Sequence, residues 1–141
     1  MLLSVIPWVI YFLLNTNVGA ALAALAAVDY HFSLFAPGKI LAFTYGQPRI
    51  GDAVFSQFVN VLEEMEKIQI YRIINENDLI PHLPPTLFDY VHFNTEYWIH
   101  KNKTFACTAS EGEVDECSAS YAPFFDSNKH VYIYDLTVRM C

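Results

Sequence analysis

Residues 14–27 of the 141-residue chain read LNTNVGAALAALAA, and this stretch decides the fold. The first 28 residues contain no Asp, Glu, Lys or Arg. An apolar run that leads into an alanine-rich segment predicts a buried strand over Trp8–Leu14, a tight turn, and a closely packed helix over Val18–Ala27. In α/β enzymes such a turn often carries a nucleophile. Here it holds Asn15, Thr16 and Asn17 instead.

The apolar start of the chain has a second interpretation. Residues 1–14 also resemble the hydrophobic region of a signal peptide, with Ala21-Leu22-Ala23 as a small-residue cleavage site, although no Lys or Arg precedes the run. A membrane span is disfavoured, because ~14 residues at about 1.5 Å each reach only ~21 Å, less than a ~30 Å hydrocarbon core. A core strand and a secretion signal, cleaved or retained as an apolar amino terminus, both stay open.

Composition and charge indicate which classes of molecule the chain can bind. The net charge is −7 and 54% of the residues are hydrophobic, which is typical of one folded domain. The basic residues are scattered, whereas nucleic-acid binding depends on clustered Lys and Arg. We therefore expect no nucleic-acid partner, and a neutral or apolar substrate instead.

The three cysteines and one glycosylation sequon bear on whether the chain is located in an oxidising compartment. Cys107 and Cys117 flank an acidic loop, and Cys141 is the last residue. Their spacing lacks the paired ligands of zinc sites, so we expect no metal and no cofactor. A Cys107–Cys117 disulfide and two buried free thiols both remain possible. Asn102 begins an N-x-T sequon that is open to glycosylation if the chain is secreted.

The middle of the chain alternates between strand and helix patterns. The predicted elements are a strand over Lys39–Tyr45, a helix from an Asp52 cap to about Glu66, a strand over Ile68–Ile74, and an edge hairpin made of Tyr90–Ile99 and Lys103–Cys107. Within the helix, Glu63 stands four residues before Lys67, which is the spacing of a helical ion pair. This order predicts a parallel α/β sheet.

The predicted sheet indicates where candidate catalytic residues should lie. Active sites of open α/β sheets lie at the carboxyl ends of the strands. Asp78 comes just after such an end, and His130 lies in a late loop. Hydrolases of this class place nucleophile, acid and histidine in that order, which points back to the turn at 15–17. The plainer interpretations are a loop or capping role for Asp78 and an exposed surface position for His130.

Four segments carry a resemblance to a known family. They are ALAALAA at 21–27, FTYGQPRIG at 43–51, NDLIPHLPP at 77–85, and YVH at 90–92 with EYWI at 96–99. In this order they resemble the helix after the GHSLGG elbow, the FGQPRVG segment, the NDPVPxLPP motif and the YxH…EYWI hairpin of class 3 lipases. From about residue 15 onward, the chain is similar to the carboxyl-terminal half of this family of fungal triacylglycerol lipases and feruloyl esterases.

The resemblance implies a fold, an activity and site residues. It implies one partial α/β-hydrolase domain over residues 1–141, with flanking helices, a carboxyl-terminal hairpin and the family's amino-terminal half missing. It also implies a secreted carboxylic-ester (acylglycerol) hydrolase acting at a lipid–water interface. Asp78 takes the position of the catalytic acid and His130 that of the base. Cys107 and Cys117 take the positions of the two cysteines of a disulfide. Cys141 takes the position of one cysteine of a second disulfide, whose partner lies in the missing amino-terminal part.

The chain departs from the family at the nucleophile. Laying GHSLGGALA on the alanine helix puts Asn17 at the serine, and leaves the Val18 N–H as half of the oxyanion hole. A carboxamide nitrogen is delocalised into its carbonyl, so no base can activate it for attack. We therefore expect a chain that is inactive as it stands. The alternatives are a non-catalytic lipid- or protein-binding homologue and an incomplete product of an active lipase gene.

A further expectation concerns association. If no upstream strand pairs with Trp8–Leu14, that strand has an unpaired apolar edge. Such an edge favours self-association or poor solubility.

Overall fold

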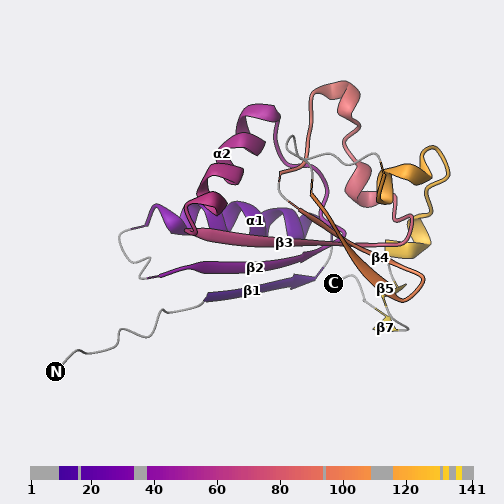
Figure 1. Cartoon of the computed structure of the whole chain (residues 1–141), viewed down its shortest axis with the longest axis horizontal. Helices are drawn as coiled ribbons and strands as arrows, with labels where there is room; N and C mark the ends of the chain where they lie inside the picture. The colour runs from indigo at the N-terminus through magenta and orange to yellow at the C-terminus, as the bar shows by residue number, and fades with distance from the viewer. Residues whose placement is uncertain are drawn as a thin grey trace.

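The computed structural model describes residues 10–15, 17–33, 38–93, 95–108, 116–130, 132–133 and 136–137. The predictions made for Trp8, Thr16 and Cys141 lie outside these residues. Five strands form one sheet in the order β1-β2-β3-β4-β5 (Figure 1). Their bounds are Ile10–Asn15 (β1), Ile40–Tyr45 (β2), Ile68–Asn75 (β3), Glu96–His100 (β4) and Lys103–Cys107 (β5). The helices are α1, Asn17–His31, and α2, Ala53–Glu64.

Short elements follow the central strands. They are the 3-10 helices η1 (Ile80–His82), η2 (Thr86–Phe88), η3 (Ser118–Tyr121) and η4 (Ser127–His130), and the paired strands β6 (Tyr132–Ile133) and β7 (Leu136–Thr137).

The strand register aligns the carboxyl ends of the central strands. β1 to β4 run parallel, and β5 is antiparallel at one edge. Asn15 of β1 pairs with Tyr45 of β2, which pairs with Ile73 of β3. This arrangement confirms the predicted parallel α/β sheet with a carboxyl-terminal hairpin. It also places the carboxyl ends of β1, β2 and β3 side by side.

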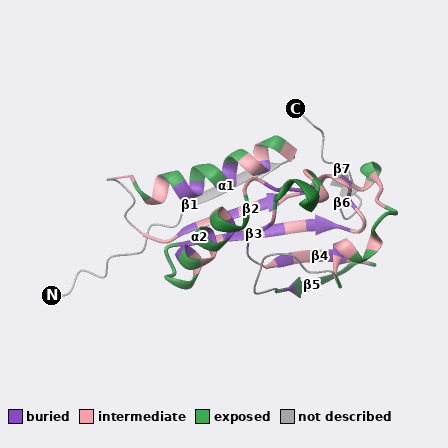
Figure 2. Cartoon of the chain, turned by 90° about the horizontal axis from the view of Figure 1, so that it is seen from above, coloured by how far each residue is buried: buried purple, intermediate pink, exposed green. Residues whose placement is uncertain are grey.

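Both helices lie on the same face of the sheet, as Figures 1 and 2 show. Alternate residues of β2 and β3 point toward them and are buried, because successive side chains of a strand point to opposite faces. The core cluster consists of Ala24, Ala27, Val28, Ile40, Ala42, Val59, Leu62, Ile68, Ile70 and Phe93. The alanines of α1 let its backbone approach the sheet closely, as the sequence predicts.

α1 extends past its predicted end at Ala27. It runs to His31 because Val28 is part of the core and Tyr30 packs against it. The ring of Phe32 then stacks on Phe58 of α2, with ring centroids 5.9 Å apart. The last turn of α1 is therefore fixed by contacts that lie far away in the sequence.

The predicted strand over Tyr90–Ile99 is wrong in its first half, because β4 begins at Glu96. The preceding residues bond to other elements instead of the sheet. The carbonyl of His92 accepts the Ser56 hydroxyl at 2.7 Å, and that of Phe93 accepts Nε of Arg72 at 2.7 Å. Phe93 is thereby placed in the core below α2, and the chain joins the sheet only after it.

α2 also differs from its prediction. Asp52 caps the helix as expected, since its carboxylate accepts the Phe55 N–H at 2.9 Å. The helix ends at Glu64, so Lys67 lies beyond it and the helical spacing of Glu63 and Lys67 does not apply. The Glu63 carboxylate instead accepts the Ile70 N–H of β3 at 2.6 Å. β4 pairs with β3 from Arg72 onward, so Glu63 occupies the edge of β3 before that point.

Glu63 gives the fold a pH dependence. Burial raises the pKa of this carboxyl from 4.5 to about 7, against the lowering effects of the Ile70 N–H, Arg72 and Lys39. The folded state thus keeps a proton that the unfolded state has released. This contribution to stability is largest below about pH 4.5, falls as the pH rises toward 7, and is constant above.

A neutral amide at residue 63 removes that loss and can still accept the Ile70 N–H. We expect Glu63→Gln to raise Tm by about 3–5 °C at pH 8, equivalent to roughly 1 kcal/mol, and by less at pH 5. Thermal unfolding followed by circular dichroism at both pH values measures the difference. Glu64→Gln, at the exposed neighbouring position, is the matched control. An equal gain at both pH values would contradict the prediction.

β1 forms one edge of the described sheet. Within the described residues β2 is its neighbour on one side, and no strand pairs on the other. Self-association through this edge stays a prediction. Among the described helices, none combines the length and apolar character that crossing a membrane requires.

Candidate active site

Asp78 lies in the loop directly after β3. Its carboxylate is almost fully buried, with 1% of the residue exposed. Oδ1 accepts the Ile80 N–H at 2.9 Å, which fixes the carboxylate plane at the start of η1. Oδ2 is left to face a second loop. The N-cap of η1 is Leu79, so Asp78 is a loop residue and not the cap of this helix, and its second oxygen has a different partner.

That partner is His130, the last residue of η4, which is 7% exposed. Its Nδ1 lies 2.8 Å from Oδ2 of Asp78. An ionised carboxylate can only accept, so Nδ1 carries the proton and donates it. Nε2 is buried and has no hydrogen-bond partner among the described residues. In a neutral imidazole with this tautomer Nε2 is the acceptor, which is the arrangement of a general base held by an acid.

Gly46, which sequence reasoning did not single out, makes room for this pair. It follows β2 directly and has φ of +56°, a conformation that favours glycine. A Cβ built there would lie 2.4 Å from Cε1 and 2.5 Å from Nδ1 of His130, and 2.9 Å from Oδ2 of Asp78. The signal in the sequence is a glycine placed at the carboxyl end of a predicted central strand, within FTYGQPRIG.

Asn17 stands at the turn between β1 and α1, as predicted. It is the first residue of α1 and has φ of +51°, in the left-handed region that asparagine tolerates better than most residues. Asn15 pairs with Tyr45, the residue before Gly46, so the turn lies at the sheet edge that holds Gly46. Val18 follows in the first turn of α1 and is exposed. The roles of Asn17 and Val18 as nucleophile position and oxyanion donor stay predictions.

Comparison with known families identifies the family of the chain. The family described as Lipase (class 3) matches residues 17–88, half of the chain. The chain belongs to the class 3 lipase family.

Individual relatives give the extent of the likeness. A lipase from Rhizomucor miehei is 33% identical over 129 residues, covering 89% of this chain and 34% of the relative. The secreted mono- and diacylglycerol lipase A of Penicillium cyclopium is 30% identical over 105 residues, covering 74% of this chain and 32% of the relative. A solved triacylglycerol lipase, whose catalytic centre is a serine protease triad, has a TM-score of 0.74 and 30% identity, covering 92% of this chain and 48% of the lipase.

These coverages show how much of each relative the chain matches. This class 3 lipase family member spans about a third of the curated relatives and about half of the solved lipase. The described sheet is accordingly part of an α/β-hydrolase fold.

Two family segments pack against each other beside the acid–base pair. Arg49, from FTYGQPRIG, donates through Nη1 to the carbonyls of His82 and, at 2.9 Å, of Pro84. Its own N–H donates to the Leu83 carbonyl at 2.8 Å. On the other side, Nε2 of His92 bonds to the Pro81 carbonyl at 2.7 Å. Burial, with Arg72 and Arg49 nearby, holds the pKa of His92 well below 6.5, so this histidine is neutral and structural.

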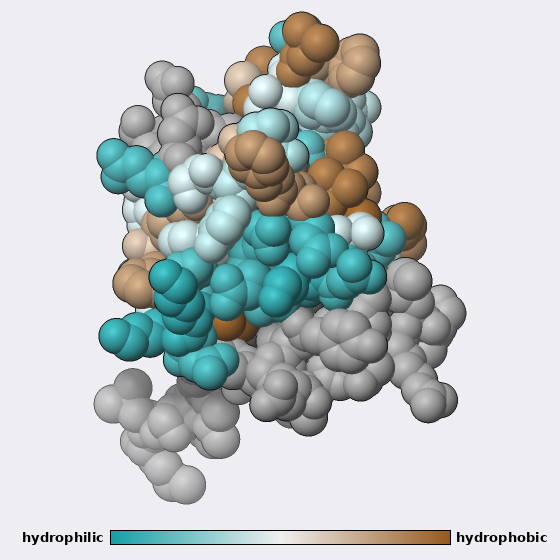
Figure 3. Space-filling view, turned by 90° about the vertical axis from the view of Figure 1, so that its right-hand side faces the viewer, coloured by the Kyte–Doolittle hydropathy of each residue, from teal (hydrophilic) through white to brown (hydrophobic). Residues whose placement is uncertain are grey.

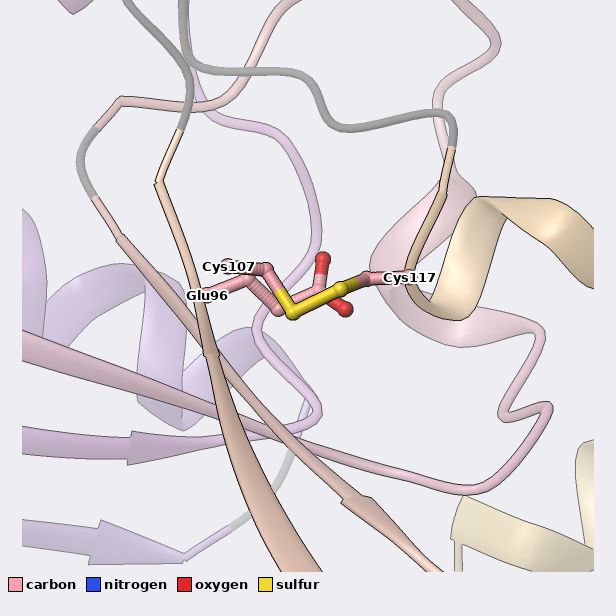
Figure 4. Close-up of side chains that lie close together, drawn as sticks. All are labelled: Glu96, Cys107 and Cys117. Atoms are coloured by element: carbon pink, nitrogen blue, oxygen red, sulfur yellow. A yellow bond between two sulfur atoms is a disulfide. The ribbon is translucent and has the colours of Figure 1, made fainter.

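The predicted disulfide of this lipase-family chain is confirmed between Cys107 and Cys117. The Glu96 carboxylate lies beside it, and one ligand atom from each of the three residues lies within 4.8 Å of the others (Figure 4). The two sulfurs are bonded to each other and are not thiolates. Glu96 instead accepts the Ser118 N–H at 3.0 Å, which anchors η3.

The sequon lies in the turn of the β4–β5 hairpin. Lys101 and Asn102 both have positive φ and are exposed, as in a two-residue hairpin turn. An exposed asparagine is accessible to the glycosylation machinery, and modification of Asn102 stays a prediction.

Proposed function

We propose that this chain is a class 3 lipase homologue that binds carboxylic-ester lipids of the acylglycerol type without hydrolysing them. The observation that carries the proposal is the buried Asp78–His130 pair with its free Nε2, at the sheet edge that also holds Asn17. The relatives support the lipid class, since those named above are lipases and include a mono- and diacylglycerol lipase.

Hydrolysis of the ester requires a nucleophile, whereas binding of the ester does not. In a relative with serine at this turn, the hydroxyl would attack the ester carbonyl, the histidine would take its proton, and the aspartate would stabilise the imidazolium. The 2.8 Å contact between Nδ1 of His130 and Oδ2 of Asp78 supports the same roles for these two residues. The Asn17 carboxamide cannot act as a nucleophile, so in the proposed function the ester binds and is not hydrolysed.

Exposed apolar side chains in the segment that follows Asp78 support contact with lipid. η2 and the residues on either side of it in the sequence expose several large hydrophobic side chains, above all Leu87 at 85% and Phe88 at 65%, with Leu83 and Tyr90 at 38% each. Phe124 is 77% exposed and its carbonyl bonds to Asn77, next to Asp78. Figure 3 shows hydrophobic side chains gathered over the upper part of the molecule, above a hydrophilic band. The chain as a whole has a net charge of −7, which favours binding to neutral lipid over anionic lipid.

The test is sedimentation with phosphatidylcholine vesicles that contain trioctanoylglycerol. We expect the chain to partition onto them, and Leu87→Ser with Phe88→Ser to lower the partition coefficient at least about tenfold, since each buried side chain contributes about 1.5–3 kcal/mol. Met65→Ser is the matched control, because Met65 is 58% exposed at the far end of α2. An equal loss in both variants, or no binding by the chain, would contradict the proposal.

We also propose an extracellular location. Its support is the Cys107–Cys117 disulfide, which suits an oxidising compartment, and a relative that is described as secreted. The exposed position of Asn102 is compatible with the same compartment.

A further inference from the structure

Two asparagines at the end of β3 bond to the loop that carries His130. Nδ2 of Asn75, the last residue of β3, donates to the carbonyl of Lys129 at 2.8 Å. Nδ2 of Asn77 donates to the carbonyl of Phe124 at 2.8 Å. Both ends of the 124–130 segment are therefore held by side chains from the segment that carries Asp78.

Backbone contacts join the same two segments at their middle. The N–H of Asp126 donates to the carbonyl of Asn77 at 2.8 Å, and Asp78 and Asp126 form an isolated parallel bridge. Within the second segment, Asp126 Oδ1 accepts both the N–H and Nδ2 of Asn128. The contacts from Asn75 and Asn77 lie on either side of this bridge, so they fix the orientation of the segment as well as its distance.

This geometry matters because η4 provides little rigidity by itself. It is a single turn of four residues, and its last residue is His130. The Lys129 carbonyl that Asn75 holds belongs to the same planar peptide unit as the N of His130. Fixing this unit fixes the backbone from which the imidazole extends. Nδ1 of His130 and Oδ2 of Asp78 can then meet without a search through loop conformations.

We propose that Asn75 and Asn77 are positioning residues, which hold His130 in register with Asp78 by donating to the carbonyls of its loop. The proposal rests on the proposed ester chemistry for its purpose, but its test reads the pair itself and needs no turnover. Asparagine is suited to the task because its amide donates to a carbonyl. An aspartate of the same shape cannot, since its carboxylate only accepts.

The experiment is proton NMR of the full chain labelled with ¹⁵N-histidine. The Nδ1 proton of His130 is assigned by its loss in His130→Gln, and its exchange with water is measured. We expect Asn75→Ala and Asn77→Ala each to speed this exchange by about tenfold, the factor for losing one hydrogen bond. Asn75→Asp is expected to behave like Asn75→Ala, because both lack the donor.

Asn128→Ala is the matched control, since its side chain bonds within the loop and not to the β3 segment. We expect it to leave the exchange rate within about twofold. Thermal unfolding of each variant shows that the fold persists, and Asn77 provides a more exposed site if Asn75→Ala does not fold. Unchanged exchange in the Asn77→Ala variant, or equal acceleration in Asn128→Ala, would overturn the proposal. So would an Asn75→Asp variant that keeps the slow exchange.

Discussion

Hydrolysis of a p-nitrophenyl ester by the chain is expected to be no faster than hydrolysis by its His130→Ala variant. In the function we propose, His130 has no hydroxyl to deprotonate, because the side chain at the nucleophile position is the Asn17 amide. Removing the serine of a serine protease lowers turnover by about 10⁶-fold, and a deficit of that order brings the rate to background. Spectrophotometric release of p-nitrophenol from purified protein measures both rates.

The reciprocal variant tests whether Asn17 stands in front of the pair. We expect Asn17→Ser to raise the rate about 100-fold, the lower end of what a positioned general base contributes. Adding His130→Ala should remove that gain. Asn17→Ala is the matched control, since it changes the same position without supplying a nucleophile. Turnover by the unmodified chain that His130→Ala abolishes would show that our assignment of Asn17 is wrong.

Replacement of Gly46 by alanine is expected to separate His130 from Asp78. The added Cβ would lie within 3 Å of both side chains, and the φ of +56° is strained for alanine. The strain costs about 1–2 kcal/mol and the overlap about 1–3 kcal/mol. We therefore expect Tm to fall by roughly 10 °C and the Nδ1 proton resonance of His130 to disappear.

Gly19→Ala is the control for this substitution. Gly19 lies in α1, and an added Cβ would meet nothing within 4 Å. Alanine in a helix is more favourable than glycine by about 0.5–1 kcal/mol, so Tm should stay the same or rise. A Gly46→Ala variant that unfolds no earlier than Gly19→Ala would refute the close packing around the pair.

The sequence predicts this site where a residue sits in a recognisable local pattern. Asp78 follows an apolar strand within NDLIPHLPP, and the Cys107–Cys117 pairing follows from the same family resemblance. The parallel sheet follows from alternating strand and helix patterns, which depend on neighbours along the chain.

The rest depends on contacts between distant segments. Tyr90, Val91 and Phe93 are apolar or aromatic like the residues of β4, yet the carbonyls of His92 and Phe93 bond to Ser56 and Arg72. Glu63 has helical spacing with Lys67, but it reaches the free edge of β3, which exists because β4 starts late. The sequence of one segment does not show which backbone groups of another segment are available to bond with it.

The distance along the chain between Asp78 and His130 has a consequence for how the molecule assembles and diverges. The two residues are 52 positions apart, yet their side chains meet at 2.8 Å, so they close one long excursion of the polypeptide. Closing a long loop costs conformational entropy before its contacts form, so we expect this contact to form late in folding. Because each doubling of loop length adds only about 0.6 kcal/mol to this cost, we expect insertions between the two ends to leave the contact in place.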